Sequence, residues 1–237
     1  MIAFKVYFNE GGLSKKAINR EIEGTLNSLG TDYLDLYIIH RFDYNTPVEE
    51  TMEALDGLVK AGKVRALGAS AMYGYQFHNM QIAARDNGWT AFSAMENHYN
   101  LPNREDERDL IPVCQQFDVS LMPYSPLAAG RLSRLEWSTD TLWSKTDKVA
   151  QAKYDSTQEA DSKVVARVHE LATKYGVSMS QIALAWQWAV GVTSPIIGAT
   201  KAKYFDDAVA ALNVSLTEED IQYLQELYVP HPVVGAV

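Results

Sequence analysis

Two polar side chains lie where the chain is otherwise apolar, and both are residue types that take part in catalysis. His40 directly follows the apolar run Leu34–Ile39, which is typical of a strand buried on both faces and so indicates a parallel sheet. Chemistry in such sheets gathers at the carboxyl ends of the strands, where His40 would lie. Lys5 interrupts a second apolar stretch, Ile2–Phe8, so its ammonium group could be aimed at a site.

Both residues also have a simpler explanation. His40 could be a structural histidine that is hydrogen-bonded to a backbone carbonyl. Lys5 could be the protective charge of an edge strand, which discourages pairing with other chains. The choice between these interpretations depends on the elements that position the two side chains.

Short apolar runs alternate with helical patterns along the whole chain. The expected strands are Ile2–Phe8, Leu34–Ile39, Val64–Ala69, Ala91–Met95, Val119–Tyr124 and Thr193–Ile197. The expected helices run from Ser14 to about Leu29, from a capping box at Thr46-Pro47-Val48-Glu49 to Gly62, at Tyr73–Asp86, Asp106–Phe117, Glu159–Tyr175, Ser178–Val190 and Ala202–Leu212, and from Thr217 onwards. This order predicts one α/β domain with a parallel sheet, wrapped by helices once or covered on both faces.

One stretch, residues 128–156, shows no clear periodicity. It contains Trp137, Trp143 and several charged residues. Loops of this length are usually functional lids or disordered segments, and the aromatic residues favour a lid.

The expected strands share a feature at their carboxyl ends, where a polar residue or a glycine follows the apolar run. These positions are His40, Ser70, Glu96, Tyr124-Ser125 and Gly198. Because the ends of parallel strands meet at one rim, five such positions predict a ligand site there.

Composition limits the classes of partner and location. The net charge of −9 argues against a nucleic acid or an anionic membrane as the main partner, since both prefer a basic surface. The single cysteine, Cys114, lies on a helical apolar pattern and fits a buried, inert thiol in a reducing compartment. No stretch approaches the length of a transmembrane helix, and the first residues do not resemble a signal peptide, so the cytoplasm is the expected location.

Several motifs, in order and at consistent spacing, resemble the aldo-keto reductases over essentially the whole chain, from Met1 to about Tyr228. They are GTDYLDLYIIHRFD, KAGKVRALGAS, ENHYN, PYSPLAAGRL and SPIIGATK. The chain is most similar to the bacterial branch related to potassium-channel β subunits. The resemblance implies a (β/α)8 barrel of the TIM-barrel class that binds NADPH, with NADH less favoured, and that reduces small aldehydes or ketones.

The resemblance also implies roles for the two catalytic candidates. His40 matches the histidine that orients the carbonyl group. Lys5 matches the lysine whose charge lowers the pKa of a proton-donating tyrosine and which pairs with an aspartate. This match favours the functional interpretation of both residues.

Further positions match the family's cofactor site. Ser70 and Glu96 match residues around the nicotinamide carboxamide, although Glu96 replaces the usual glutamine and Ala71 the usual asparagine. Tyr124 matches the aromatic residue that stacks on the nicotinamide. The remaining matches are Ser125, Leu127 and Gly130 near the pyrophosphate, Lys145 over the phosphates, and Gly198, Thr200, Tyr204 and Asp207 around the adenosine and its 2′-phosphate. As alternatives, Tyr124 could be a core residue, Thr200 a helix cap and Lys145 a solvated charge.

The sequence departs from the family at its start. A (β/α)8 barrel has eight strands, whereas only six are expected here, so we expect an incomplete, N-terminally truncated barrel without the first two βα units. In the family these units carry the catalytic tyrosine and aspartate. Tyr7 is too close to Lys5 in sequence, and Tyr37 should point to the opposite face from His40, so neither is expected to replace the tyrosine.

An incomplete barrel would have two open sheet edges, at the strand of Lys5 and at Thr193–Ile197, and we expect self-association through them. Activity of this chain should then be impaired. The alternative function is a non-catalytic NADPH-binding or interaction protein.

Overall fold

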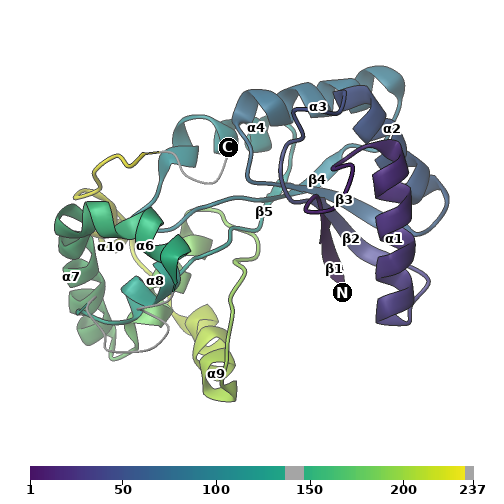
Figure 1. Cartoon of the computed structure of the whole chain (residues 1–237). Coiled ribbons are helices and arrows are strands. Elements are labelled where there is room, and N and C mark those ends of the chain that lie inside the picture. Colours follow the sequence, from purple (N-terminus) through teal and green to yellow (C-terminus); the bar gives the residue numbers. More distant parts are fainter. Residues whose placement is uncertain (137–146, 233–237) are drawn as a thin grey trace. The chain divides into compact units, whose positions relative to one another are not determined.

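The computed structural model describes residues 1–136 and 147–232, and its residues form two compact units (Figure 1). The first unit holds Met1–Asn97 and Asp106–Leu121. The second holds His98–Glu105 and the described residues from Met122 onwards. The sequence had predicted one undivided domain.

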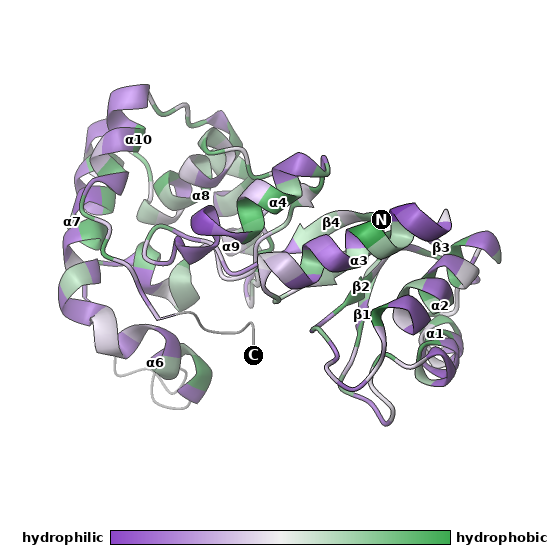
Figure 2. Ribbon diagram, turned by 90° about the horizontal axis from the view of Figure 1, so that it is seen from above, coloured by the Kyte–Doolittle hydropathy of each residue, from purple (hydrophilic) through white to green (hydrophobic). Residues whose placement is uncertain are grey.

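The first unit is built on a sheet of five parallel strands in sequential order. The strands are β1 (Ala3–Val6), β2 (Leu34–Ile39), β3 (Val64–Ser70), β4 (Phe92–Glu96) and β5 (Ser120–Leu121). Hydrophobic residues are concentrated in these strands, whereas the helices carry hydrophobic and hydrophilic residues side by side (Figure 2). The parallel sheet confirms the α/β class and is consistent with part of a (β/α)8 barrel.

The register of the strands places the polar candidates on one face of the sheet. Lys5 pairs with Ile38, Ile38 with Gly68, and Gly68 with Ala94. Ser70 and Glu96 are paired two residues further along β3 and β4. Because side chains alternate between faces, residues two apart share a face, and Lys5, Ser70 and Glu96 therefore point to the same side.

The sheet is curled towards this face. The Lys5 ammonium forms an ion pair with the Glu96 carboxylate, although β2 and β3 lie between their strands. Three strand spacings of about 4.8 Å would separate β1 from β4 in a flat sheet, so the contact requires strong curvature.

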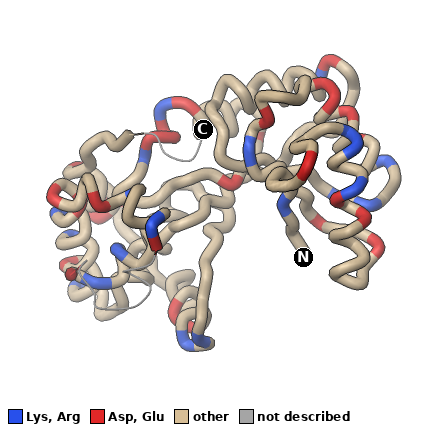
Figure 3. The backbone as a smooth tube through the Cα atoms, viewed as in Figure 1, with Lys and Arg blue, Asp and Glu red and all other residues tan. Residues whose placement is uncertain are grey.

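Helices α1 (Lys15–Leu29), α2 (Val48–Lys60), α3 (Gly74–Asn87) and α4 (Leu110–Gln116) follow one another along the other face of the sheet (Figure 1). Helix α1 begins where expected, since the Ser14 hydroxyl accepts a hydrogen bond from the amide of Ala17. It ends at Gly30, whose φ of 65° is the left-handed conformation that suits glycine. Charged residues of both signs are interspersed along α1–α3 (Figure 3).

The start of α2 differs from the expectation. Its N-cap is Pro47, and no side chain caps the helix. The Thr46 hydroxyl, expected to cap it, instead donates a hydrogen bond of 2.8 Å to the Asp43 carboxylate. The predicted capping box is therefore wrong, because a tertiary partner claims the threonine.

The second unit is mostly helical. Its described helices are α6 (Lys148–Tyr154), α7 (Gln158–Tyr175), α8 (Met179–Ala189), α9 (Ala202–Ala210) and α10 (Glu218–Gln225), with short 3₁₀ helices η2 (Ala128–Ser133), η3 (Asp155–Thr157) and η4 (Ala211–Asn213). Residues 128–156 thus contain helical turns where none was expected. A lid role for this stretch stays a prediction.

The expected sixth strand, Thr193–Ile197, is reduced to a single bridge among the described residues, between Ile196 and Tyr124. The amide of Ile196 donates a hydrogen bond of 2.9 Å to the carbonyl of Pro123. The strand prediction was wrong in extent, because only one residue of the run pairs with a neighbour.

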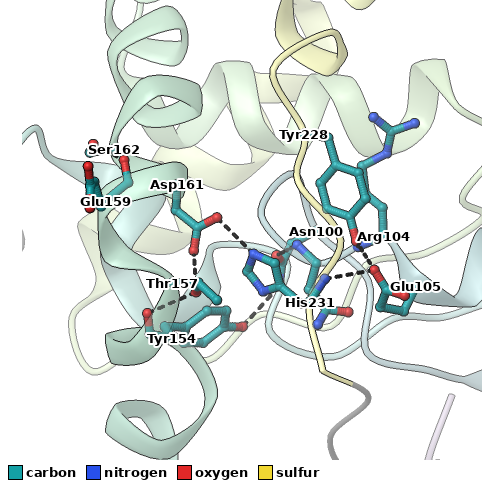
Figure 4. A network of polar contacts seen from close by, with 11 residues as sticks. Asn100, Arg104, Glu105, Tyr154, Thr157, Glu159, Asp161, Ser162, Tyr228 and His231 are labelled. Carbon is teal, nitrogen blue, oxygen red and sulfur yellow. Dashed lines mark hydrogen bonds and ion pairs between the residues drawn. The ribbon is translucent and has the colours of Figure 1, made fainter.

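A buried polar network holds the C-terminal segment of the second unit (Figure 4). The imidazole Nε2 of His231 lies 2.9 Å from Oδ1 of Asp161 on α7, and both side chains are almost fully buried. The other Asp161 oxygen accepts a hydrogen bond of 2.7 Å from the Thr157 hydroxyl. The Glu105 carboxylate accepts hydrogen bonds from the amide of His231 and the hydroxyl of Tyr228. The segment after α10 is thereby tied to α7 and to the turn at Glu105.

Candidate active site

His40 lies just beyond β2, and its backbone amide donates a hydrogen bond of 2.9 Å to the carbonyl of Val6. Among the described residues, no hydrogen bond forms to its imidazole, so the interpretation as a structural histidine bonded to a carbonyl is not supported. The ring packs edge-on against Phe8, with 4.9 Å between centroids. Burial lowers the pKa of His40 to about 4, helped by the positive charges of Lys5 and Arg41. The imidazole is therefore neutral at pH 7, with both ring nitrogens available to a ligand.

Lys5 reaches Glu96 across the curled sheet. The Glu96 side chain is only 5% exposed, whereas that of Lys5 is 34% exposed. A buried carboxylate is costly unless it is paired, so the lysine both satisfies Glu96 and is held by it. Lys5 is thus paired with Glu96, and its catalytic role stays a prediction.

Ser70 and Ala71 fix the backbone of Glu96. The Ser70 hydroxyl donates a hydrogen bond of 2.8 Å to the Glu96 carbonyl, and the Ala71 amide lies 3.3 Å from the same oxygen. Ala71 has a φ of 44°, an unfavourable conformation for a residue other than glycine. Strained backbone of this kind concentrates at functional sites, which agrees with the prediction of a site at this rim.

A groove of about 870 Å³ opens in the first unit on the side of Phe8, the residue that packs against His40. It is lined by Tyr7, Phe8, Asn9, Glu10, Gly11, Gly12, Ser14, Asp43, Asn45 and Thr46. Asp43 organises it by accepting hydrogen bonds from the amides of Leu13 and Asn45 and from the Thr46 hydroxyl. Burial raises the pKa of the Asp43 carboxyl, but these hydrogen bonds outweigh it and leave the pKa below the usual value. The sequence analysis missed this role, although the aspartate follows His40 by three residues.

The two tyrosines considered as proton donors lie as expected. Tyr7 lines the groove and packs against Phe8. Tyr37 is fully buried, and its hydroxyl has no hydrogen-bond partner. Burial raises the pKa of Tyr37, and the charge of Glu21 on α1 adds to the effect, which places the ring on the helix side of the sheet. Tyr37 is therefore unsuited to giving up a proton at neutral pH.

In the second unit, Tyr124 is partly buried and stacks on His98. The two rings are nearly parallel, at 3°, with 5.1 Å between centroids. The Lys153 ammonium lies 4.5 Å from the Tyr124 ring centroid. The hydroxyl of Tyr154 lies 2.7 Å from Nε2 of His98, and burial lowers the pKa of His98 to about 3. The Tyr124 ring thus has the His98 ring stacked on it and the Lys153 ammonium over it, and its role in stacking on a nicotinamide stays a prediction. His98, part of the ENHYN motif, is a partner that the sequence analysis missed.

The loop after Tyr124 is conformationally unusual. Ser125, Ala128 and Ala129 all have a positive φ without being glycine, and Gly130 has a φ of 88°. The carbonyl of Ser125 accepts a hydrogen bond of 2.9 Å from the Asn100 side chain. Leu127 precedes η2, and its carbonyl accepts a hydrogen bond from the amide of Gly130. Strained backbone of this kind clusters at functional sites, and the cofactor role of this loop stays a prediction.

The residues predicted to bind the adenosine are gathered around α9. Gly198, Thr200 and Tyr204 are exposed. The Asp207 carboxylate accepts a hydrogen bond of 3.0 Å from the Ser178 hydroxyl and so ties α9 to the start of α8. Helix α9 has Lys201 as its N-cap and no capping side chain, so the alternative interpretation of Thr200 as a helix cap is wrong.

The remaining residue assignments for the site stay predictions. Lys145, Trp137 and Trp143 lie outside the described residues. The structure brings Lys5, Ser70 and Glu96 together in the first unit and places Tyr124, Ser125, Leu127 and Gly130 on one loop of the second. That both sets of residues bind a single ligand stays a prediction. Within the described ranges, no three histidine, cysteine or carboxylate side chains are grouped for a metal ion, and no helix is long and apolar enough to cross a membrane.

Comparison with known proteins identifies relatives along nearly the whole chain. A model of the aldo/keto reductase family matches residues 1–229. The chain is 46% identical to an aldo-keto reductase of Fusarium vanettenii over 98% of its own length. It is 42% identical to the versiconal hemiacetal acetate reductase of Aspergillus parasiticus over 96% of its length. It is also 41% identical to an aldo-keto reductase of Alternaria alternata over 98% of its length.

The relatives are longer than this chain. The matched region makes up 62% of the Fusarium protein, 66% of the Aspergillus protein and 62% of the Alternaria protein. The chain thus spans a little under two thirds of the length of these three relatives.

Proposed function

The chain belongs to the aldo/keto reductase family, and from this premise we propose that it serves the NADPH-dependent reduction of a small aldehyde or ketone to an alcohol. One observation carries the proposal. His40, at the carboxyl end of β2, is a neutral imidazole without a hydrogen-bond partner among the described residues, on a rim where Lys5 and Glu96 already form an ion pair. An unused imidazole beside a cation suits a carbonyl oxygen that gains negative charge.

The described residues fit a nicotinamide dinucleotide. The strained loop Ser125–Gly130 is followed by Arg131 and Arg134, which suits an anionic pyrophosphate. Tyr124 offers a ring for stacking, and exposed Tyr204, with the Lys203 ammonium 5.3 Å from its ring centroid, suits an adenosine that carries a 2′-phosphate. We therefore propose NADPH rather than NADH, held by Ser70, Glu96, Tyr124, Ser125, Leu127, Gly130, Lys145, Gly198, Thr200, Tyr204 and Asp207.

Reduced nicotinamide, when bound, supplies a hydride to the carbonyl carbon. The chain's own residues do the rest of the work in this proposal. His40 donates a hydrogen bond to the carbonyl oxygen and orients it, and the Lys5 charge favours negative charge on that oxygen. Within the 237 residues, no tyrosine or aspartate matches the family's proton donor and its partner. We propose that the chain, taken by itself, turns over slowly for this reason.

A second function, cofactor binding without turnover, is favoured by the same unmatched tyrosine and aspartate. We place either activity in the cytoplasm as a proposal, since the single cysteine fits a reducing compartment. The relatives named above are fungal. The resemblance to the bacterial branch with potassium-channel β subunits therefore stays a proposal.

We also propose self-association through the edge of β1. Phe4, on β1, is 43% exposed, and Ile2 and Phe8, just before and after this strand, are 44% and 72% exposed. Among the described strands, β1 pairs only with β2. Exposed apolar side chains on a free strand edge favour pairing with another chain. Light scattering of the purified chain should show a dimer or larger species, and a stable monomer would refute this part of the proposal.

Binding and turnover can be separated in one preparation. NADPH fluorescence titration should show saturable binding that is tighter than that of NADH. Consumption of NADPH with 4-nitrobenzaldehyde should be slow and should fall further in His40→Gln. His169→Gln, on the exposed surface of α7, is the matched control and should change neither. Absence of any NADPH binding would refute the proposed function, and fast turnover would refute the proposed impairment.

A further inference from the structure

Among the described residues, the Glu96 carboxylate forms its ion pair with Lys5. This pair lies at the rim of the sheet in the first unit. Lys5 and Glu96 come from β1 and β4, which are not neighbours in the sheet. Their ion pair is formed over the shared face of β2 and β3. The pair therefore bridges the four strands whose ends carry the candidate active site.

The residues between them leave room for the contact. At the level of Lys5, the paired residues of β3 and β4 are Gly68 and Ala94, the two smallest residue types. A Cβ atom on Gly68 would lie 3.0 Å from Cγ1 of Ile38. The lysine stem can thus reach across a face that carries almost no side-chain volume in β3 and β4.

The position of Glu96 is fixed independently of the lysine. Its backbone carbonyl accepts the hydrogen bond from Ser70 and approaches the Ala71 amide. Its side chain is 5% exposed, so the carboxylate has little access to water. Glu96 is therefore the buried partner with a fixed backbone, and Lys5 is the more exposed partner.

We propose that Glu96 is the positioning residue that holds the Lys5 ammonium at the active-site rim. The family resemblance leads one to expect an uncharged glutamine at this position and an aspartate elsewhere as the partner of the lysine. No aspartate of this chain contacts Lys5 among the described residues, and the structure gives the partner role to Glu96. A glutamine there would satisfy a hydrogen bond but would supply no charge. The catalytic consequence rests on the proposed function, whereas the positioning of Lys5 does not.

The positioning is tested on the full chain by competitive acylation with limiting acetic anhydride, read by mass spectrometry. The reagent must reach the amine, and the ion pair with the Glu96 carboxylate shields the Lys5 amine from it. Lys16 on the exposed surface of α1 serves as the internal reference. Lys5 should be labelled more slowly than Lys16 in the original chain. Glu96→Gln should speed the labelling of Lys5 by at least about threefold, and Glu96→Asp should give an intermediate rate. An unchanged rate in Glu96→Gln would overturn the proposal.

Loss of the fold could also expose Lys5, so a second measurement is needed. A double-mutant cycle uses Glu96→Gln, Lys5→Met and the double variant Lys5→Met/Glu96→Gln. The urea midpoint of unfolding is measured for each variant. The effect of Glu96→Gln on the midpoint should be clearly smaller when Lys5 is already methionine. Equal effects in both backgrounds would overturn the proposal.

Carbonyl reduction supplies the functional readout. Glu96→Gln should lower kcat by about tenfold with little change in the KM for the carbonyl, and Glu96→Asp should recover part of it. A change in KM alone would overturn the link between Glu96 and catalysis. Failure of the proposed function would appear as absent NADPH binding in the original chain, which leaves the labelling result intact.

Discussion

Removal of the His231 imidazole should destabilise the second unit strongly. His231 and Asp161 are 1% and 2% exposed at their side chains, and their contact of 2.9 Å is one of two that satisfy the Asp161 carboxylate. In His231→Ala, the Thr157 hydroxyl, at 2.7 Å, would remain as the hydrogen-bond partner of that carboxylate among the described residues. One carboxylate oxygen would then be buried without a donor.

The expected cost follows from this geometry. A buried acceptor left without a hydrogen-bond partner costs about 1–3 kcal/mol. The truncation also leaves a small cavity, which adds to the loss. We therefore expect His231→Ala to lower the free energy of unfolding by about 3 kcal/mol.

The assay is urea unfolding followed by circular dichroism, together with limited proteolysis of the C-terminal segment. His169→Ala is the matched control, because His169 lies on the exposed side of α7, the helix that carries Asp161. The control should stay within about 0.5 kcal/mol of the original chain. The double variant His231→Ala/Asp161→Ala should lose less free energy of unfolding than the sum of the losses in the two single variants. A His231→Ala variant as stable as His169→Ala would refute the assignment of the network as an anchor.

Three further predictions concern the first unit. Gly12→Ala should lower the free energy of unfolding by about 1–3 kcal/mol, because Gly12 has a φ of 54° and an added Cβ would lie 2.3 Å from Oδ2 of Asp43. Gly24, inside α1, has open space around it, so Gly24→Ala should raise the free energy of unfolding by about 0.5–1 kcal/mol in the same urea titration. The reverse order of the two variants would contradict the reasoning. The pKa of His40 is about 4 in the folded chain against about 6.5 when unfolded, so the unfolded state binds the proton more readily. The stability present above pH 6.5 is therefore lost as the pH falls towards 4. His40→Gln should reduce the loss in free energy of unfolding between pH 7 and pH 5 by about 1 kcal/mol, and an unchanged loss would refute the shift. Burial raises the pKa of the Cys114 thiol to about 12 and leaves it 0% exposed, so 5,5′-dithiobis(2-nitrobenzoic acid) should react with it only after denaturation, and rapid reaction of the native chain would refute its burial.

Local signals in the sequence predicted most elements of the fold. Ser14 and Gly30 bound α1 as expected, since a capping hydroxyl and a left-handed glycine act within one turn. The capping box at Thr46 failed because the hydroxyl found a better partner in Asp43, a contact that no helix signal contains. Thr193–Ile197 has the composition of a strand, but a strand also needs a paired neighbour, and only Ile196 has one among the described residues.

The candidate site was predictable only as far as alternation along a strand reaches. The shared face of Lys5 and the strand ends follows from a period of two, and the burial of Tyr37 on the other face follows from the same rule. The contact between Lys5 and Glu96 depends on how far the sheet curls, which no single strand encodes. The stacking of His98 on Tyr124 likewise joins two segments that are 26 residues apart in the sequence.

The two charges at the rim explain why His40 is available to a ligand. A lone lysine beside the imidazole would repel a second proton but would also attract any carboxylate that could reach it. Glu96 takes that place, because its backbone is fixed by Ser70 and its side chain is already paired. Among the described residues, no carboxylate forms an ion pair with His40, and burial keeps the ring neutral. A neutral imidazole can donate one hydrogen bond to a carbonyl oxygen without committing a charge to it, which is the property that the proposed reaction needs from this position.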